Sequence, residues 1–165
     1  MNPGRANPFP PLSRWIPSRF EAVEALALEV RGLLATHGLQ AALFAVELSV
    51  REGLNNAVRH GNRGDEAKRV DFNLSCGRKW ICVRIKDEGD GFNWREKRGA
   101  PQPDHTSPSG RGLRILARYA SRIRFNRSGN QVTLWLLRDG RSKSPRTPAK
   151  PAVGGANVRS AQIRK

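Results

Sequence analysis

The sequence predicts an α+β fold, a two-layer α/β sandwich with helices packed on one face of a mixed, mostly antiparallel sheet. Two apolar stripes with helical spacing lie in the first 60 residues. Two pairs of segments with alternating apolar residues follow, and a glycine-containing turn separates the members of each pair. A period of 3.6 residues indicates helix and a period of 2 indicates strand. Helices and hairpins in this order are typical of α+β domains.

Two helices are predicted before residue 61. The first begins at a Ser-x-x-Glu pattern, Ser18 to Glu21, which is typical of a capping box, and it ends near Gly38. The second runs from about Leu39 to His60. A short edge strand is expected at 14–16. The apolar stripes are Val23, Leu26, Ala27, Val30, Leu33 and Leu34 in the first helix, and Leu43, Val46, Val50, Leu54 and Ala57 in the second.

Two hairpins and a third helix are predicted in the second half of the chain. The first hairpin turns around Gly77, the helix opens at Gly110, and the second hairpin turns at 128–130. The alternating residues are Val70, Phe72, Leu74 and Cys76, then Ile81, Val83 and Ile85, then Ile123 and Phe125, then Val132, Leu134 and Leu136. The helix has Leu113, Leu116, Ala117 and Ala120 at helical spacing.

The domain organisation predicted from composition is a single domain at 15–138, because 165 residues with 38% hydrophobic content suffice for one core. The Pro-rich leader at 1–14 and the basic tail at 139–165 are expected to be disordered. A segment rich in Pro, Gly and charge at about 93–109 is expected to form a mobile lid, whose Arg95, Lys97 and Arg98 could either reach phosphate or be surface charges.

The charge balance favours acidic partners. The formal net charge is +16, and the tail from Gly140 to Lys165 holds seven Lys or Arg and no acid. Such a charge attracts nucleic acid through its phosphates, although the tail has no interleaved aromatic residues and predicts only non-specific binding. The two cysteines lie on opposite faces of a predicted hairpin and no Cys/His set has zinc spacing, which predicts reduced thiols. The sequence has no apolar run of about 18 residues, which predicts a cytoplasmic protein with no membrane contact.

Three polar residues on the second predicted helix form the first candidate feature. Glu52, Asn56 and His60 are spaced by four, which stacks side chains on one helix face. A carboxylate and a carboxamide can then converge on one object, and magnesium-bound phosphate suits both. A solvated surface row, with Glu52 paired to an arginine, would give the same spacing.

Asp87 and two glycines form the second feature. The parity of the preceding strand sends Asp87 toward the core, where a carboxylate requires a hydrogen bond or a charge partner. The exocyclic amino group of adenine would provide one, while Gly89 and Gly91 let the backbone approach a flat ring. An ordinary strand-ending turn uses the same residue types.

The third feature is Gly110-Arg111-Gly112 at a helix start. Free backbone N–H groups, the helix dipole and the Arg111 cation suit phosphate oxygens. A simple N-terminal turn is the alternative, so specificity rests on the order and spacing of all three features. No Walker-type phosphate loop is present in the sequence.

Taken together, these motifs resemble the GHKL superfamily of ATP-binding domains, and most closely the anti-sigma-factor serine kinases. The resemblance covers about Trp15 to Arg138. It rests on Glu52-Gly53-Leu54-Asn55-Asn56-Ala57-Val58-Arg59-His60-Gly61, on Asp87-x-Gly89-x-Gly91-Phe92 and on Gly110-x-Gly112-Leu113. Members often carry Thr-Thr before the last strand, where this chain has Asn130-Gln131-Val132.

The resemblance implies roles for these residues. Asn56 would coordinate magnesium, Glu52 would act as general base or polarise the attacking group, and Asp87 would recognise the adenine of ATP. The glycines of the last two motifs would shape the pocket, and His60 is expected to be structural. Phosphoryl transfer needs mainly positioning and charge neutralisation, which these residue types supply.

The function expected from the resemblance is that of an anti-sigma factor and protein serine/threonine kinase, which phosphorylates an antagonist protein and sequesters a sigma factor. A homodimer is also implied. Two alternatives stay open: a regulator that binds ATP without transferring phosphate, and a basic nucleic-acid-binding protein whose glycine motifs are structural.

Overall fold

The computed structural model describes residues 8–93 and 108–141. The first half of the fold contains β1 (Leu12–Pro17), α1 (Phe20–Thr36), α2 (Gln40–Asn56), a π-helical turn η1 (Ala57–Gly61), β2 (Arg69–Cys76) and β3 (Trp80–Asp87). The second half contains α4 (Pro108–Tyr119), β4 (Arg122–Phe125) and β5 (Gln131–Leu137). Half of the predicted leader and most of the predicted lid and tail lie outside the described residues.

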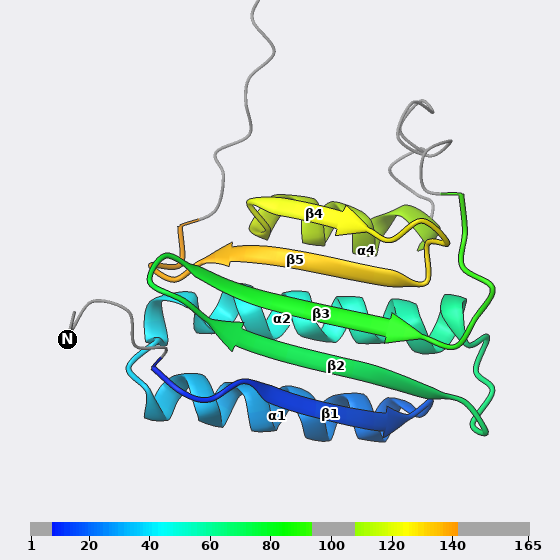
Figure 1. The fold of residues 1–165 in the computed structure, drawn as a ribbon, viewed down its shortest axis with the longest axis horizontal. Coiled ribbons are helices and arrows are strands. Elements are labelled where there is room, and N and C mark those ends of the chain that lie inside the picture. Colours follow the sequence, from blue (N-terminus) through cyan, green and yellow to red (C-terminus); the bar gives the residue numbers. More distant parts are fainter. Residues whose placement is uncertain (1–7, 94–107, 142–165) are drawn as a thin grey trace, which may run out of the picture.

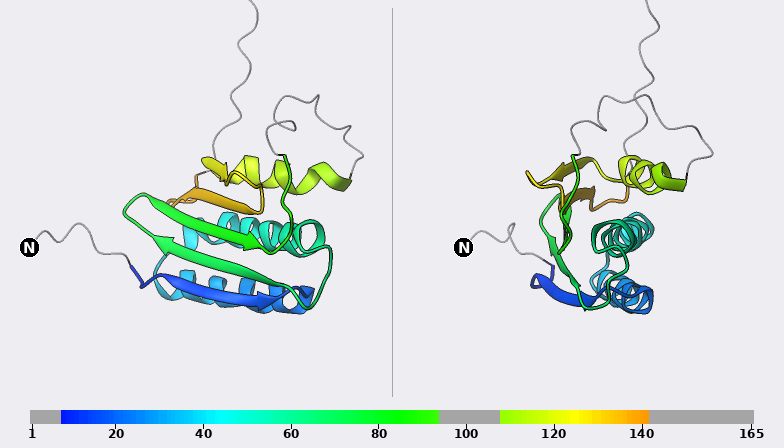
Figure 2. Two further views of the ribbon diagram at one scale, coloured as in Figure 1. Left: turned by 45° about the vertical axis from the view of Figure 1, so that its right-hand side comes forward. Right: turned by 90° about the vertical axis from the view of Figure 1, so that its right-hand side faces the viewer.

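The described strands form one five-stranded sheet with the order β1-β2-β3-β5-β4, and each neighbouring pair is antiparallel. The α-helices of the described residues, α1, α2 and α4, lie on the same face of the sheet (Figure 1). The two layers, sheet and helices, are separate in the end-on view of Figure 2. The predicted α+β sandwich is therefore confirmed, and the sheet is antiparallel throughout the described residues rather than mixed.

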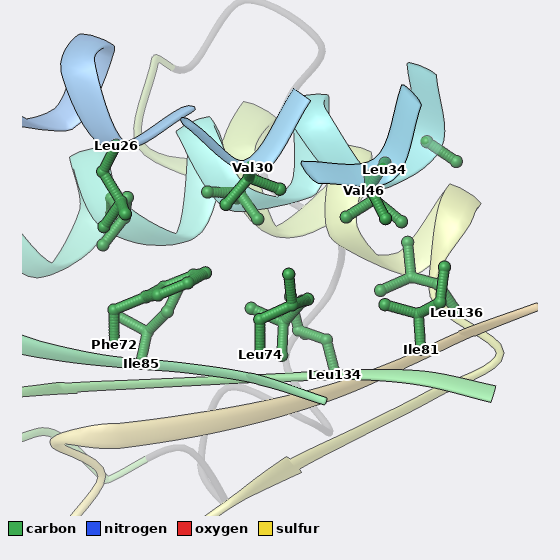
Figure 3. Close-up of a cluster of buried hydrophobic side chains, with 14 of the residues drawn as sticks. Leu26, Val30, Leu34, Val46, Phe72, Leu74, Ile81, Ile85, Leu134 and Leu136 are labelled. Atoms are coloured by element: carbon green, nitrogen blue, oxygen red, sulfur yellow. The ribbon is translucent and has the colours of Figure 1, made fainter. Parts of the chain in front are cut away.

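The core lies between the two layers and follows the predicted periodicities. Alternate residues of β2, β3 and β5 point toward the helices (Figure 3). The apolar stripes of α1 and α2 point toward the sheet. Burying one such side chain contributes about 1.5–3 kcal/mol. The largest of these fully buried side chains include Leu34, Leu54, Phe72, Leu74, Ile81, Ile85, Leu134 and Leu136.

Several local predictions were wrong or incomplete. The N-cap of α1 is Arg19 and has no side-chain capping bond, and the Ser18 hydroxyl is buried without a partner among the described residues. Because the helix begins one residue later than the pattern requires, Glu21 is not at the capping position. Ala117 is exposed, although Leu116 beside it is buried. Phe9 is also buried, so the core extends ahead of the predicted boundary at residue 15.

The predicted helix at 39–60 consists of two parts. The α-helix ends at Asn56, and Ala57–Gly61 forms the wider π-helical turn η1. The Asn62 N–H donates to the Ala57 carbonyl at 2.7 Å, a bond that spans five residues rather than four. Single π turns inside helices occur frequently at functional sites.

None of the helices in the described part of the chain is long and apolar enough to cross a membrane.

Candidate functional site

A cavity of about 300 Å³ lies between the helical layer and one end of the sheet. This volume is at the lower end of the range typical of small-molecule sites, and its lining is mostly apolar with a few polar groups, as such sites usually are. The lining residues are Gly53, Asn56, Ala57, His60, Gly61, Ile85, Asp87, Gly91, Phe92, Leu116, Phe125, Gly129 and Val132. They come from α2, η1, β3 and the loop after it, α4, and the β4–β5 hairpin with its turn.

Asp87 is the acidic residue that lines this cavity, and it is the last residue of β3. Its side chain is only 9% exposed, and its Oδ1 accepts a hydrogen bond from the Gly89 N–H at 2.9 Å. Burial raises the pKa of the Asp87 carboxyl, while the Gly89 N–H and, more weakly, the Lys68 charge act to lower it. The prediction that this carboxylate points inward is confirmed.

Glycines permit the close packing around Asp87. A Cβ at Gly61 would overlap the Asp87 carboxyl group, and a Cβ at Gly89 would overlap the Gly61 carbonyl. The π-helical turn therefore presents bare backbone to the carboxylate. A side chain at either glycine would displace Asp87 or the turn beneath it.

The predicted polar row is only partly retained around the cavity. Asn56 and His60 line it, whereas Glu52 does not. Glu52 and Asn56 do converge on α4, because a Cβ at Gly112 would lie 3.0 Å from Glu52 Oε2 and 3.0 Å from Asn56 Nδ2. His60 lies on η1 rather than on α2, so its position departs from the regular spacing of four that the sequence suggests.

Gly91 and Phe92 form a wall of the cavity by contacting the β4–β5 turn. Gly91 has a φ of +77°, and a Cβ there would overlap the Ser128 carbonyl, while a Cβ at Gly129 would overlap the Phe92 backbone. The Phe92 ring makes an edge contact with the Phe125 ring, with centroids 5.4 Å apart. These contacts hold the end of the Asp87 loop against β4 and β5.

Gly110 and Arg111 lie in the first turn of α4. The surroundings of Gly110 and the side chain of Arg111 are outside the described part of the structure, as are residues 94–107 of the predicted lid at about 93–109. The phosphate contacts predicted for Gly110 and Arg111 therefore stay predictions.

Sequence reasoning missed several residues around Asp87. Asn62 and Asn130 hydrogen-bond to the backbone next to Asp87, and Leu116, Phe125 and Val132 supply apolar walls. Asn130 was noted only as a departure from Thr-Thr, and Asn62 belongs to no periodic pattern. The apolar residues carried a core signal, but sequence spacing does not separate a cavity wall from the rest of a core.

Other chemistries have less support in the described residues. No group of three or more His, Cys, Asp or Glu side chains there could hold a metal ion. Burial raises the pKa of both the Cys76 and the Cys82 thiol, so neither is activated as a nucleophile. A magnesium ion that keeps several waters and bridges phosphates needs only one or two protein oxygens, and the Asn56 amide fits that requirement.

Comparison with known proteins identifies the family. Residues 16–136, most of the chain, match the family described as the histidine kinase-like ATPase domain. The chain belongs to this family. The resemblance expected from the motifs is thereby confirmed, and the five-stranded sheet with helices on one face agrees with the fold of histidine kinase-like ATPases.

The chain is also similar to a curated protein. The chain is 27% identical over 128 residues to the serine-protein kinase RsbW of Bacillus subtilis (strain 168). The similar region covers 72% of this chain and 80% of that protein. Histidine kinase-like ATPase domains bind ATP, usually with magnesium.

Proposed function

We propose that this chain is an anti-sigma factor with protein serine/threonine kinase activity, which binds Mg-ATP and phosphorylates an antagonist protein. The observation that carries the proposal is the buried Asp87 carboxylate in an apolar cavity that Asn56 also lines. The side chains of Glu52 and Asn56 both lie close to Gly112 of α4. The family match and the similarity to a serine-protein kinase support the same activity.

The Asp87 end of the cavity suits the adenine base. The Gly89 N–H donates to Oδ1 of the Asp87 carboxylate, and two carboxylate oxygens have capacity for further donors. An exocyclic amino group donates in the plane of its ring, and a buried carboxylate gains most from such a donor. The walls formed by Ile85, Val132 and the Phe92 ring are apolar, as a flat heterocycle requires.

The other end of the site suits the triphosphate. Asn56 would provide an amide oxygen to magnesium, and the magnesium supplies charge neutralisation between the phosphates when bound. The first turn of α4 begins at Pro108, and the N–H groups and positive dipole end of a helix start would suit phosphate oxygens. Gly112 brings this helix close to Glu52 and Asn56.

Glu52 is proposed as the general base. Its carboxylate would accept the proton of a serine or threonine hydroxyl while that oxygen forms a bond to the γ-phosphorus. The bond between the γ-phosphorus and the β–γ bridging oxygen breaks, leaving ADP and a phosphorylated protein. His60, which is exposed on η1, is assigned no chemical role.

The proposed partners are an antagonist protein as phosphate acceptor and a sigma factor as the sequestered protein. The name of the relative supports a serine in a protein as the acceptor. A homodimer is proposed on the same resemblance.

The test compares Glu52→Gln with the unmodified chain. Calorimetry with Mg-ATP measures binding, and γ-labelled ATP measures phosphate transfer to antagonist proteins that co-purify with the chain. We expect Glu52→Gln to bind ATP within about threefold of the unmodified chain and to lose transfer by at least about 100-fold. Glu66→Gln, on an exposed ion pair with Arg19, is the matched control and should change neither.

The outcomes separate the alternatives. Binding without transfer by the unmodified chain would show a non-catalytic ATP-binding regulator. Transfer that survives Glu52→Gln would contradict the base assignment. The absence of binding heat at millimolar ATP would contradict the proposal as a whole.

A further inference from the structure

Asn62 holds one side of the loop that carries Asp87. Its side chain is fully buried; its Oδ1 accepts a hydrogen bond from the Glu88 N–H at 2.8 Å, and its Nδ2 donates to the Arg69 carbonyl at 3.0 Å. Because Asn62 directly follows η1, this amide ties three segments together: the end of the π-helical turn, the start of β2 and the first residue after β3.

Asn130 holds the other side of the same loop. Its Nδ2 donates to the carbonyls of Asp87 at 3.3 Å and Gly89 at 3.4 Å, and its own carbonyl accepts from the Asp87 N–H at 3.0 Å. The orientation of the amide is set by two donors to Asn130 Oδ1, which are Asn126 Nδ2 at 2.7 Å and Ser128 Oγ at 2.9 Å. The Asn130 amino group therefore faces the loop.

We propose that Asn62 and Asn130 form an asparagine clamp that positions the Asp87 carboxylate for the base of the nucleotide. The inference rests on the proposed ATP site and adds two positioning residues that touch neither base nor phosphate. Asn62 bonds to the Glu88 N–H, and Asn130 bonds to the backbone of Asp87 and Gly89.

The need for a clamp follows from the composition of the loop. Without such hydrogen bonds, Gly89 and Gly91 would let Asp87–Phe92 adopt many conformations, and ordering the loop on ligand binding would reduce affinity. Side-chain amides that bond to the loop backbone order the loop when the chain folds. The conformational entropy is then lost before binding, and the Asp87 carboxylate is already in place when the base enters. The neighbouring glycines give Asp87 little other side-chain support.

The experiment measures the affinity of Asn62→Ala and Asn130→Ala for two nucleotides by calorimetry. One is ATP, and the other is purine riboside triphosphate, which lacks the exocyclic amino group. Each variant should lose about tenfold or more in affinity for ATP and less than about threefold for the analogue. Asn73→Ala, on the opposite face of the sheet with Ser13 as its partner, is the control and should change neither affinity.

A double-mutant cycle separates positioning from general weakening of the fold. In an Asp87→Ala background, adding Asn130→Ala should produce little further loss of ATP affinity, because the group that it positions is absent. Equal losses for both nucleotides, or losses that multiply in the cycle, would overturn the proposal.

Hydrogen exchange tests the clamp without any nucleotide. In Asn62→Ala, the Glu88 amide loses its acceptor, so its exchange should become at least tenfold faster while the amides of central β3 residues such as Val83 keep their protection. Unchanged exchange at Glu88 would overturn the clamp even if ATP binds. If the unmodified chain fails to bind ATP while Glu88 exchange responds as expected, the proposed function fails and the clamp remains a structural feature.

Discussion

At the scale of single residues, the buried Asp87 carboxylate lowers the stability of the nucleotide-free fold, while the proposed function requires that carboxylate. This carboxylate is buried beside backbone and apolar walls, and its pKa is raised chiefly by that burial. The folded chain therefore holds a proton on Asp87 more tightly than the unfolded chain does. Its unfolding free energy decreases as the pH rises from the unfolded-state pKa through the folded-state pKa.

Asp87→Asn should stabilise the nucleotide-free chain and weaken its affinity for ATP. The Asn oxygen can still accept the Gly89 N–H, while the cost of the buried charge disappears. Urea unfolding from about pH 3 to pH 7 measures this effect. The variant's advantage should be absent at the acidic end, grow as the pH rises and coincide with at least about tenfold weaker ATP binding. A stability difference that is constant over the pH range would refute the assignment of the effect to Asp87 ionisation.

At the scale of elements, the approach of α4 to α2 determines the phosphate end of the site. The helices contact each other, and a Cβ at Gly112 would lie only 3.0 Å from polar atoms of Glu52 and Asn56. At the other end of the site, the π-helical turn after α2 also allows close packing, because Gly61 has no side chain to overlap the Asp87 carboxyl. Both ends of the cavity thus depend on helix segments that bring bare backbone close to polar groups.

Gly112→Ala should affect catalysis more than stability. A methyl group there would force the Glu52 and Asn56 side chains to shift by a few tenths of an ångström, a cost that offsets the gain of about 0.5–1 kcal/mol from replacing Gly in a helix. We expect phosphate transfer to fall by about tenfold or more with a nearly unchanged melting temperature.

Gly32→Ala provides the matched control for that variant. Gly32 lies in α1, and a Cβ there would meet no atom within 4 Å. The substitution should stabilise the chain by about 0.5–1 kcal/mol and leave transfer unchanged. Equal transfer by the two variants would contradict the proposed proximity of α4 to the reacting groups.

At the scale of the whole molecule, the layered domain and the basic tail are expected to act independently. The residues after Arg141 contain six Lys or Arg and no acid. β5, the last strand of the described residues, pairs with both β3 and β4, and it ends at Leu137, ahead of that segment. The domain should therefore fold without the tail.

A chain shortened after Arg141 should keep its melting temperature and its ATP affinity. Its non-specific affinity for duplex DNA should fall, and the dependence of log affinity on log salt should become shallower, because each lost phosphate contact removes about 0.9 from the slope. Fluorescence anisotropy with a labelled duplex at several salt concentrations measures both quantities. An unchanged slope would show that charges of the folded domain carry the binding.

Periodicity predicted most of the architecture because it depends on which residues face the core. The alternation in β2 and β3 predicted their hairpin and also the inward direction of Asp87, since side-chain direction in a strand depends only on parity. Capping and turn geometry were less accessible. The start of α1 shifted by one residue from the Ser18 pattern, and η1 replaced a regular helical turn, because both depend on tertiary contacts rather than on local preference.

The sequence by itself determined the layers, the hairpins and the three motifs of the candidate site, because these follow from local spacing and residue type. Only the tertiary structure decided that Asn56 lines the cavity and Glu52 does not, that Gly61 admits the Asp87 carboxyl, and that Asn62 and Asn130 hold its loop. Those contacts join residues as many as 43 positions apart. Their geometry depends on how closely backbone segments pack, which no spacing along the chain specifies.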